Sequence, residues 1–262
     1  MSTKTLIKAT PWDTAAFSMP AWELAEYSEA ALQQAARTPG HHTIRVDPLA
    51  DKRLLNQYGF YYCDTLIEPR CNAARLRPVQ HPDATISKEL DAELVLKVGH
   101  GAFAHGRFHR DFNLPKAAAD LRYDNWLKQL LEARQVYGLY WQGSLAGFIG
   151  YSADSLVLHA LAEQQRGKGR AKFWWSAVCS ELLAAGDEKH LSGHPHEEIK
   201  SSISASNLGA LNLYASLGFS FSNPQDIYHH MTRSETFDGT TSHSTRQSKD
   251  DNQVDGYVRA SA

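Results

Sequence analysis

A short segment rich in glycine and basic residues has the clearest chemical meaning in this sequence. It runs from Glu163 to Ala171 (EQQRGKGRA), between a predicted strand and a predicted helix. The first backbone N–H groups of a helix lack partners within the helix and carry partial positive charge, which favours a bound phosphate. Gly167 and Gly169 would let the backbone approach that phosphate without an intervening Cβ atom. The basic residues that add positive charge are Arg166, Lys168 and Arg170. The sequence therefore predicts a phosphate-binding turn, and the alternative is a solvated loop that contains glycine.

Two common phosphate-binding motifs do not fit this segment. A Walker loop requires G-x-x-x-x-G-K-[ST], but Lys168 is followed by Gly169 and the earlier glycine is absent. A dinucleotide-binding fingerprint requires G-x-G-x-x-G, and Lys172 occupies the position of its third glycine. The segment therefore predicts a different kind of phosphate ligand site.

A second chemically informative stretch runs from Ser204 to Phe219 (SASNLGALNLYASLGF). Asn207 precedes a predicted helix and could cap it. Tyr214 lies on that helix, where a core aromatic residue is one interpretation. The other is a general acid, because a phenol with an ordinary pKa near ~10 stays protonated at neutral pH.

Together, the two stretches resemble the GNAT superfamily of acetyl-CoA-dependent N-acetyltransferases. Gln164-x-x-Gly167-x-Gly169 resembles the [QR]-x-x-G-x-[GA] motif of that family, and Asn207 to Phe219 resembles its N-x-x-A-x-x-x-Y-x-x-x-G-F element. The resemblance covers residues 91–233 and implies acetyl-CoA as co-substrate, with no metal. It also implies that backbone groups of Leu161 and Glu163 bind the pantetheine arm, that Asn207 contacts the cofactor, and that Tyr214 is the acid. The residues that would hold the pyrophosphate are Arg166, Gly167, Lys168, Gly169, Arg170 and Ala171.

Amine acetylation also requires a neutral amine, so a base or a water chain must remove a proton. His159, Glu163 and Asp64 are candidates, and the sequence does not choose among them. His159 lies in an apolar run, where a histidine in the core or in a groove is the simpler interpretation. The oxyanion of the tetrahedral intermediate would meet a backbone N–H near Leu161 or Ala162.

A narrower resemblance concerns the acceptor. Residues 1–233 resemble the bacterial dTDP-fucosamine acetyltransferase type, which acetylates an amino group of a nucleotide-linked sugar. The resemblance rests on a Leu55 to Phe60 element, on the loop from Phe103 to Asp111 (FAHGRFHRD), and on the Asn207 and Tyr214 positions. It departs at Leu213, where that type would have an arginine. The residues that it implies for substrate binding are Arg107, Asp111 and Asp64. Equally, this loop could simply pack its own aromatic residues.

Hydrophobic periodicity and turn residues predict the elements that must position these groups. Strands are expected over 41–46, 60–67, 136–141, 144–151, 155–162, 199–205, 219–222 and 227–232. Helices are expected, at least in part, over 12–37, 51–58, 91–108, 116–133, 168–185 and 208–216. Short turns join the three strands after residue 136, which indicates an antiparallel meander. The fold class is therefore α+β, with a mixed, mostly antiparallel sheet flanked by helices.

The order of these elements suggests three parts. A smaller α/β region, which resembles a truncated GNAT half, covers residues 1–80. A GNAT domain covers residues 81–232. Residues 233–262 are rich in Ser, Thr, Asp, Gly and Gln and are expected to be a disordered tail. His190, His194 and His196 lie in a polar segment whose spacing matches no standard zinc motif.

Composition narrows the class of protein further. The 262 residues carry a formal net charge of −2, so binding of nucleic acid through bulk electrostatics is not expected. No run of 18 apolar residues appears, so no membrane association is expected. Three cysteines cannot form a disulfide framework, and we expect a cytoplasmic protein.

The function expected from these observations is transfer of an acetyl group from acetyl-CoA to a primary amine, either the amino group of a nucleotide-linked sugar, as the narrower resemblance implies, or another small amine. A non-catalytic acyl-CoA-binding protein and a protein or peptide acetyltransferase remain alternatives. The expected partners are acetyl-CoA and a small amine, and the sequence leaves open a homodimer.

Overall fold

The computed structural model describes residues 5–185 and 197–232. The expected disordered tail and the three histidines at positions 190, 194 and 196 lie outside these ranges. Within them, no helix is both long enough and apolar enough to cross a membrane.

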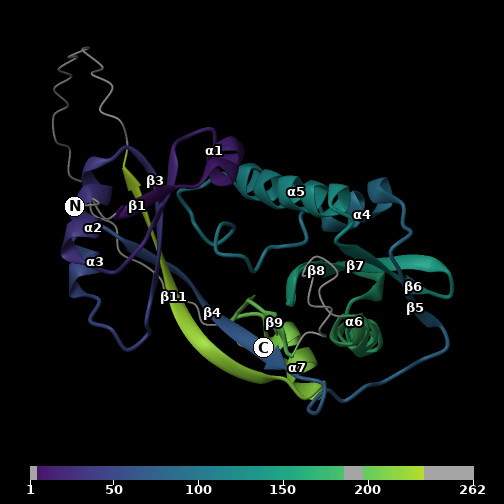
Figure 1. Cartoon of the computed structure of the whole chain (residues 1–262). Coiled ribbons are helices and arrows are strands. Elements are labelled where there is room, and N and C mark those ends of the chain that lie inside the picture. Colours follow the sequence, from purple (N-terminus) through teal and green to yellow (C-terminus); the bar gives the residue numbers. More distant parts are fainter. Residues whose placement is uncertain (1–4, 186–196, 233–262) are drawn as a thin grey trace, which may run out of the picture.

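The described chain builds one mixed sheet with helices on both faces (Figure 1). The strands are β1 (Ile7–Ala9), β2 (Ala21–Leu24), β3 (Gly40–Val46), β4 (Tyr61–Cys71), β5 (Ala84–Ser87), β6 (Val136–Trp141), β7 (Ser144–Ser152), β8 (Ser155–Leu161), β9 (Ile199–Ser201), β10 (Ile203–Ser204) and β11 (Ser220–Thr232). The helices are α1 (Pro11–Phe17), α2 (Glu29–Arg37), α3 (Arg53–Gln57), α4 (Ala92–Gly99), α5 (Lys116–Glu132), α6 (Ala171–Ala185) and α7 (Leu208–Ser216). The expected α+β class is confirmed.

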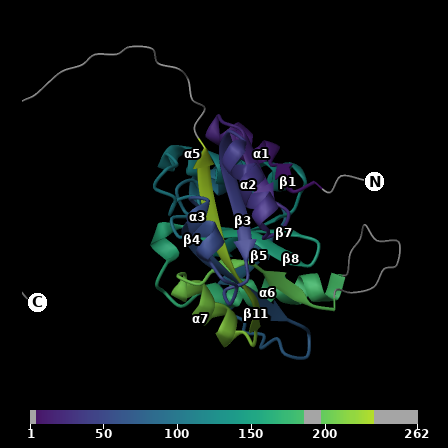
Figure 2. The same cartoon turned by 90° about the vertical axis from the view of Figure 1, so that its left-hand side faces the viewer.

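The strands follow the order β1-β2-β3-β11-β4-β9-β8-β7-β6-β5, and β10 pairs with β4 off this path. Only β2 with β3 and β8 with β9 are parallel among the described pairs. The long strands β11 and β4 cross the middle of the molecule and join its two halves (Figures 1 and 2). The expected division near residue 80 therefore falls within a continuous sheet, because β4 lies before that point and its neighbour β9 lies after it.

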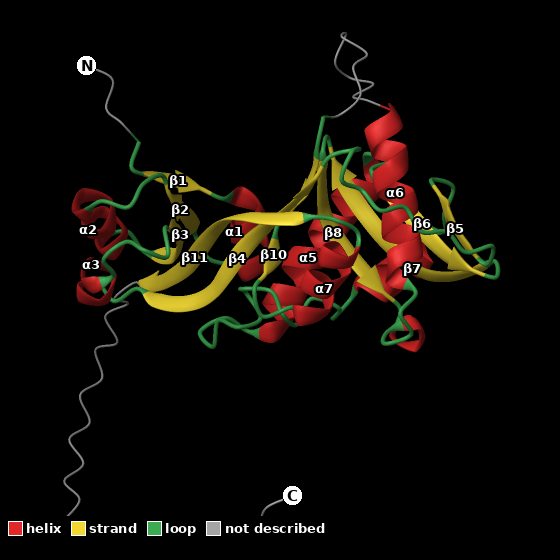
Figure 3. Ribbon diagram, turned by 90° about the horizontal axis from the view of Figure 1, so that it is seen from below, coloured by secondary structure: helices red, strands yellow, loops and turns green. Residues whose placement is uncertain are grey.

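Each half has its own apolar core. In the N-terminal half, α2 packs Leu32 and Ala35 against Ile44 of β3, and Ser28 caps this helix by accepting a hydrogen bond from the N–H of Ala31. In the other half, α4 and α5 cover one face of β7 and β8, where Phe148 is buried. The remaining helices of this half, α6 and α7, are labelled in Figure 3, and they pack on a separate core that contains Trp174.

Several elements differ from the expected ones. The helix expected over 91–108 ends at Gly99, and Gly101 follows with a φ of 69°, a left-handed conformation that stops a helix. The region 12–37 contains β2 between α1 and α2. The two strands expected over 219–222 and 227–232 form the single strand β11, whose register shifts between Ser222 and Gln225. Asn223, within this shift, has a φ of 49°. The turn-forming residues that suggested an end to the strand therefore form a bulge within it.

Candidate active site

The two neighbouring strands β8 and β9 separate soon after they meet. They pair in parallel only at Ser155 with Lys200 and at Leu156 with Ser201. Immediately afterwards β8 contains an extra residue, Val157, relative to its other neighbour β7. Such a bulge bends a strand and changes the face to which later side chains point. The remainder of β8 therefore runs on without β9 beside it, and its free edge is where a ligand could pair with the backbone.

Tyr214 and His159 meet beside this separation. The Tyr214 hydroxyl lies 3.2 Å from His159 Nε2, and Trp175 Nε1 donates a hydrogen bond to the same hydroxyl over 3.4 Å. Tyr214 is 0% exposed and packs edge-on against Phe219 at 4.8 Å between ring centroids. The tautomer of His159 decides whether the phenol donates to this histidine or accepts from it. Tyr214 is thus a core aromatic residue, and its role as an acid stays a prediction.

Burial fixes the protonation states of this pair. Burial raises the pKa of the Tyr214 phenol above its ordinary value, against hydrogen bonds from Ser201 and Trp175 that lower it. Burial also lowers the pKa of His159 to about 4. At neutral pH the phenol is therefore protonated and the imidazole is neutral. A neutral imidazole can accept a proton at one nitrogen, and it is a far weaker acid than imidazolium.

The turn that follows β8 has the character expected of an anion site. Gly167 and Gly169 have φ values of 72° and 67°, and a Cβ atom built on either would meet nothing within 4 Å. Within the described residues, no oxygen accepts a hydrogen bond from the backbone N–H groups of Gly167, Lys168 or Gly169. All three residues are exposed. The N–H groups of this turn are therefore available to an external acceptor at the start of α6, which begins at Ala171.

The arginines and the strand end around this turn have partners within the protein. Arg166 Nε donates to the backbone oxygen of Leu161 over 3.0 Å, and Arg166 N–H donates to the backbone oxygen of Glu163 over 3.2 Å. Arg170 donates to the Gln165 side chain over 2.8 Å and stacks on Trp141, with its Cζ atom 3.8 Å from the ring centroid. Glu163 lies in a one-turn helix over Glu163–Gln165 rather than in the strand. No described contact tests the roles predicted for these residues toward a cofactor.

Asn207 caps helix α7, as one interpretation predicted. Its side-chain oxygen accepts a hydrogen bond from the N–H of Ala210 over 3.1 Å. Contact with a cofactor remains a prediction, because the capping oxygen already has this protein partner while the amide nitrogen has none among the described residues.

Asp64 on β4 lies in a small polar network with Arg110 and with serines of the segment before α7. Its Oδ1 accepts hydrogen bonds from Ser204 Oγ and from Arg110 Nη1, each with a donor–acceptor distance of 2.7 Å. Arg110 also donates to Ser206 Oγ over 3.2 Å. The Oδ2 atom of Asp64 is buried without a partner among the described residues. Burial raises the pKa of Asp64, although the hydrogen bond from Ser204 and the charge of Arg110 act in the opposite direction.

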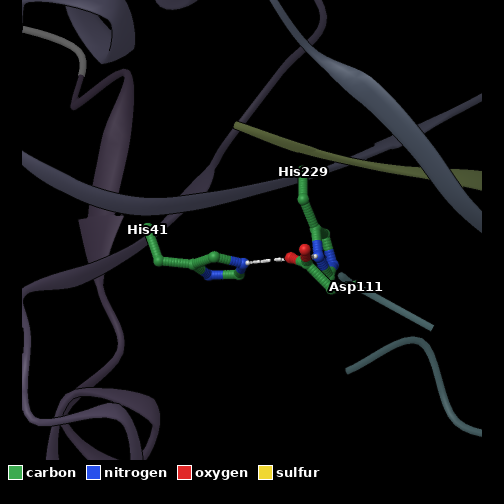
Figure 4. A group of neighbouring side chains, drawn as sticks. All are labelled: His41, Asp111 and His229. Carbon is green, nitrogen blue, oxygen red and sulfur yellow. Dashed lines mark hydrogen bonds and ion pairs between the residues drawn. The ribbon is translucent and has the colours of Figure 1, made fainter. Parts of the chain in front are cut away.

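Asp111 is enclosed by protein donors (Figure 4). Its Oδ2 lies 2.8 Å from His229 Nδ1, 3.2 Å from His41 Nε2 and 3.0 Å from the Tyr61 hydroxyl. The Asp111 and His229 side chains are 0% exposed, and that of His41 is 1% exposed. Although burial opposes it, hydrogen bonds from His229 and His41 hold the pKa of Asp111 well below its usual range. An external substrate could reach this carboxylate only if the loop moved, so the predicted role of Asp111 in substrate binding gains no support from its position.

Arg107 also faces protein. Its guanidinium stacks on Phe108, with Cζ 4.8 Å from the ring centroid, and its Nε is buried without a partner among the described residues. Burial lowers the pKa of Arg107. In contrast, Phe112 in the same loop is 99% exposed. The loop thus combines the aromatic packing of the simpler interpretation with one aromatic ring left open to solvent.

Sequence reasoning missed the histidines around Asp111. His41, Asp111 and His229 are far apart along the chain, and only the pairing of β3 with β11 brings the two histidines together. The signal in the sequence was a pair of His-His dipeptides, at 41–42 and 229–230, each inside a predicted strand. A dipeptide of this kind does not say which strands pair, so the cluster could not be predicted from it.

Comparison with known proteins supports the fold. No protein-family model and no curated protein sequence matches this chain significantly. A GCN5-related N-acetyltransferase from Sphaerobacter thermophilus aligns with a TM-score of 0.55 at 12% identity, over 86% of this chain and 75% of that one. A functionally unknown protein from Staphylococcus epidermidis also gives 0.55 at 12% identity, over 87% and 92% of the two chains. A Drosophila protein gives 0.55 at 13% identity, over 81% and 71%. At these identities the likeness concerns the fold alone, and the chain has the fold of the GCN5-related N-acetyltransferases.

Proposed function

We propose that this protein transfers an acetyl group from acetyl-CoA to a primary amine. The observation that carries the proposal is the free edge of β8 beyond Leu156, which leads directly into a turn with unpaired backbone N–H groups at Gly167, Lys168 and Gly169. A strand edge can pair with the amides of a pantetheine arm, and a turn at a helix N-terminus suits a pyrophosphate. Acetyl-CoA contains both groups within one molecule.

The residues at the strand separation suit the chemistry. The amine nitrogen attacks the thioester carbonyl, the new C–N bond forms, and the C–S bond breaks to release CoA thiolate. Tyr214 would protonate that thiolate, because its phenol is protonated at neutral pH and lies 3.2 Å from His159 on β8, the strand whose edge would hold the pantetheine arm. The nitrogen loses its excess proton to a base or to water. Asp64, with one buried oxygen unpartnered among the described residues, is the best supported of the three base candidates.

The favoured acceptor is the amino group of a nucleotide-linked sugar. Phe112 supports this choice, because an exposed aromatic ring offers a stacking surface for a base. The loop arginines support it less. Arg110 is already paired with Asp64, and Arg107 is half-buried and stacked on Phe108, so both already have contacts within the protein.

The test measures CoA release with a thiol reagent for a panel of amines, with acetyl-CoA binding measured separately by calorimetry. The panel should contain dTDP-linked 4-amino sugars, the corresponding free amino sugars, polyamines and lysine peptides. Release above the amine-free rate supports the enzyme. If acetyl-CoA binds but no amine accelerates release, the catalytic proposal fails and a non-catalytic binder is left. If lysine peptides alone are acetylated, a protein acetyltransferase replaces the amino-sugar proposal.

One variant separates nucleotide-linked from free sugars. Phe112→Ala should raise KM for the nucleotide-linked amino sugar about fivefold or more, the range of lost base stacking, and leave KM for the free sugar unchanged. An equal effect on both sugars would remove the nucleotide from the proposal without affecting acetyl transfer itself.

A further inference from the structure

The cluster of His41, Asp111 and His229 has the composition and geometry of a metal site. Its three nearest atoms are His41 Nε2, Asp111 Oδ2 and His229 Nδ1, and each residue comes from a different part of the chain. The separations are 3.2 Å from His41 to Asp111, 2.8 Å from His229 to Asp111, and 3.3 Å between the two histidine nitrogens. Figure 4 shows the two rings and the carboxylate turned toward a common point.

These distances allow a cation at ordinary bond lengths. A triangle with these three sides has a circumradius of about 1.8 Å, so a point about 2.1 Å from every corner lies roughly 1 Å out of its plane. From that point the pairs of ligand atoms subtend angles of about 85–105°, which is the arrangement of three ligands on one face of a metal ion. The Tyr61 hydroxyl lies close by, 3.0 Å from Asp111 Oδ2.

Hydrogen bonds alone leave this cluster without a fixed positive charge. The two imidazole nitrogens lie against Asp111 Oδ2, and the Tyr61 hydroxyl lies 3.0 Å from Oδ2 and 3.1 Å from Oδ1, so the carboxylate has three neutral hydrogen-bonding neighbours. No lysine or arginine within residues 5–185 and 197–232 forms an ion pair with this buried carboxylate. A buried charge is ordinarily paired or bound to a metal. A divalent cation would supply the missing positive charge and would accept the lone pairs of all three atoms.

We propose that His41, Asp111 and His229 bind a divalent transition-metal cation of the Zn²⁺ type. Two imidazoles and one carboxylate suit Zn²⁺ better than Mg²⁺ or Ca²⁺, which prefer oxygen ligands. The site is structural, because its ligands are buried and belong to the N-terminal half (β3), to the last strand (β11) and to the loop before α5. The cation would fix this loop in place, and with it Arg110 and the Asp64 network. The site does not depend on the acetyl-transfer proposal.

The test uses the full chain, first as purified and then after removal of metals with a chelator. Metal analysis of the purified protein should find about one equivalent of a transition metal per chain. Added back to the metal-free protein, Zn²⁺ at a hundredfold excess over Kd should raise Tm by about 5 °C or more. Co²⁺ should give a visible d–d absorption band without the intense sulfur charge-transfer band of a cysteine site.

Four variants assign the site to these residues. Asp111→Asn and His229→Gln should both abolish the Co²⁺ band and the Tm rise. His42→Gln is a matched control, because His42 is a buried neighbour of His41 whose ring nitrogens have no partner among the described residues, and it should retain both signals. A variant with glutamine at 190, 194 and 196 should also retain them.

Three results would overturn the proposal. One is a wild-type chain that holds no transition metal and gives neither a Co²⁺ band nor a Tm rise. The others are full metal binding in Asp111→Asn and His229→Gln, or loss of binding in the triple variant at 190, 194 and 196. Since the Co²⁺ spectrum of the wild type is informative by itself, the proposal stays falsifiable even where one variant fails to fold.

Discussion

Replacement of Tyr214 by phenylalanine separates its two roles, as an acid and as a part of the core. The substitution removes one oxygen and keeps the ring that packs against Phe219. It leaves Trp175 Nε1 and His159 Nε2 without their partner at 3.4 Å and 3.2 Å. Two long hydrogen bonds are worth about 1–2 kcal/mol together, so Tm should fall by roughly 2–8 °C.

The effect on turnover should be much larger. A general acid contributes about 10²–10⁴-fold to rate, so kcat for Tyr214→Phe should fall by that factor while the Kd for acetyl-CoA stays near the wild-type value. Because burial raises the pKa of the Tyr214 phenol, the acid form persists through neutral pH. The deficit should therefore be the same at pH 7 and pH 9.

A second tyrosine provides the control. Tyr137 is 1% exposed in the same core and donates its hydroxyl proton to Glu181 over 2.8 Å. Tyr137→Phe should lower Tm by a similar amount without changing kcat. The acid role of Tyr214 is refuted if kcat of Tyr214→Phe stays within about twofold of wild type, or if Tyr137→Phe loses as much activity.

The remaining predictions concern the anion site and acid stability. Gly167→Ala and Gly169→Ala should each cost about 1 kcal/mol in urea unfolding, because both residues have positive φ and open surroundings. Both substitutions should also weaken acetyl-CoA binding tenfold or more in calorimetry. Gly143→Ala is the control, because Gly143 has a φ of 78° and equally open surroundings: it should lower the free energy of unfolding by the same amount and leave acetyl-CoA binding unchanged. Equal affinity in all three variants would remove the turn from the proposed cofactor site. His159 has its pKa lowered to about 4 against about 6.5 in the unfolded chain, so its contribution to stability is present above pH 6.5 and is lost as pH falls toward 4. Urea unfolding should therefore show a smaller loss of stability between pH 7 and pH 4 for His159→Gln than for wild type, by up to about 3 kcal/mol. The same loss in both proteins would contradict a neutral His159.

Local patterns in the sequence sufficed for part of the fold. Turn residues and periodicity predicted β6, β7 and β8 to within a residue, and Asn207 caps the helix that was expected to follow it. Such features depend on neighbouring residues alone. The glycine turn is also a local feature, since Gly167 and Gly169 adopt the backbone conformation that glycine permits.

Features that depend on pairing between distant segments could not be predicted. The continuous strand β11 was expected as two strands, because Asn223 and the proline after it resemble a turn. In the structure, pairing with β3 and β4 keeps the segment in one strand. Likewise, Asp64 and Asp111 were identified as polar groups near a substrate. In the structure, Asp64 contacts Ser204 and Asp111 contacts His229, each more than a hundred residues away in sequence. These contacts bury both carboxylates, which local sequence could not indicate.

The position of β11 has a consequence for biosynthesis. This strand lies between β3 and β4 and pairs with both, so each of them lacks one of its neighbours until residues 220–232 have been made. Until then one edge of each strand is unpaired and open to pairing with other chains. Contacts over such long sequence separations form late and slowly. The first eighty residues must therefore leave the ribosome long before they can complete their sheet, and a nascent chain that stops before β11 is the form most exposed to aggregation.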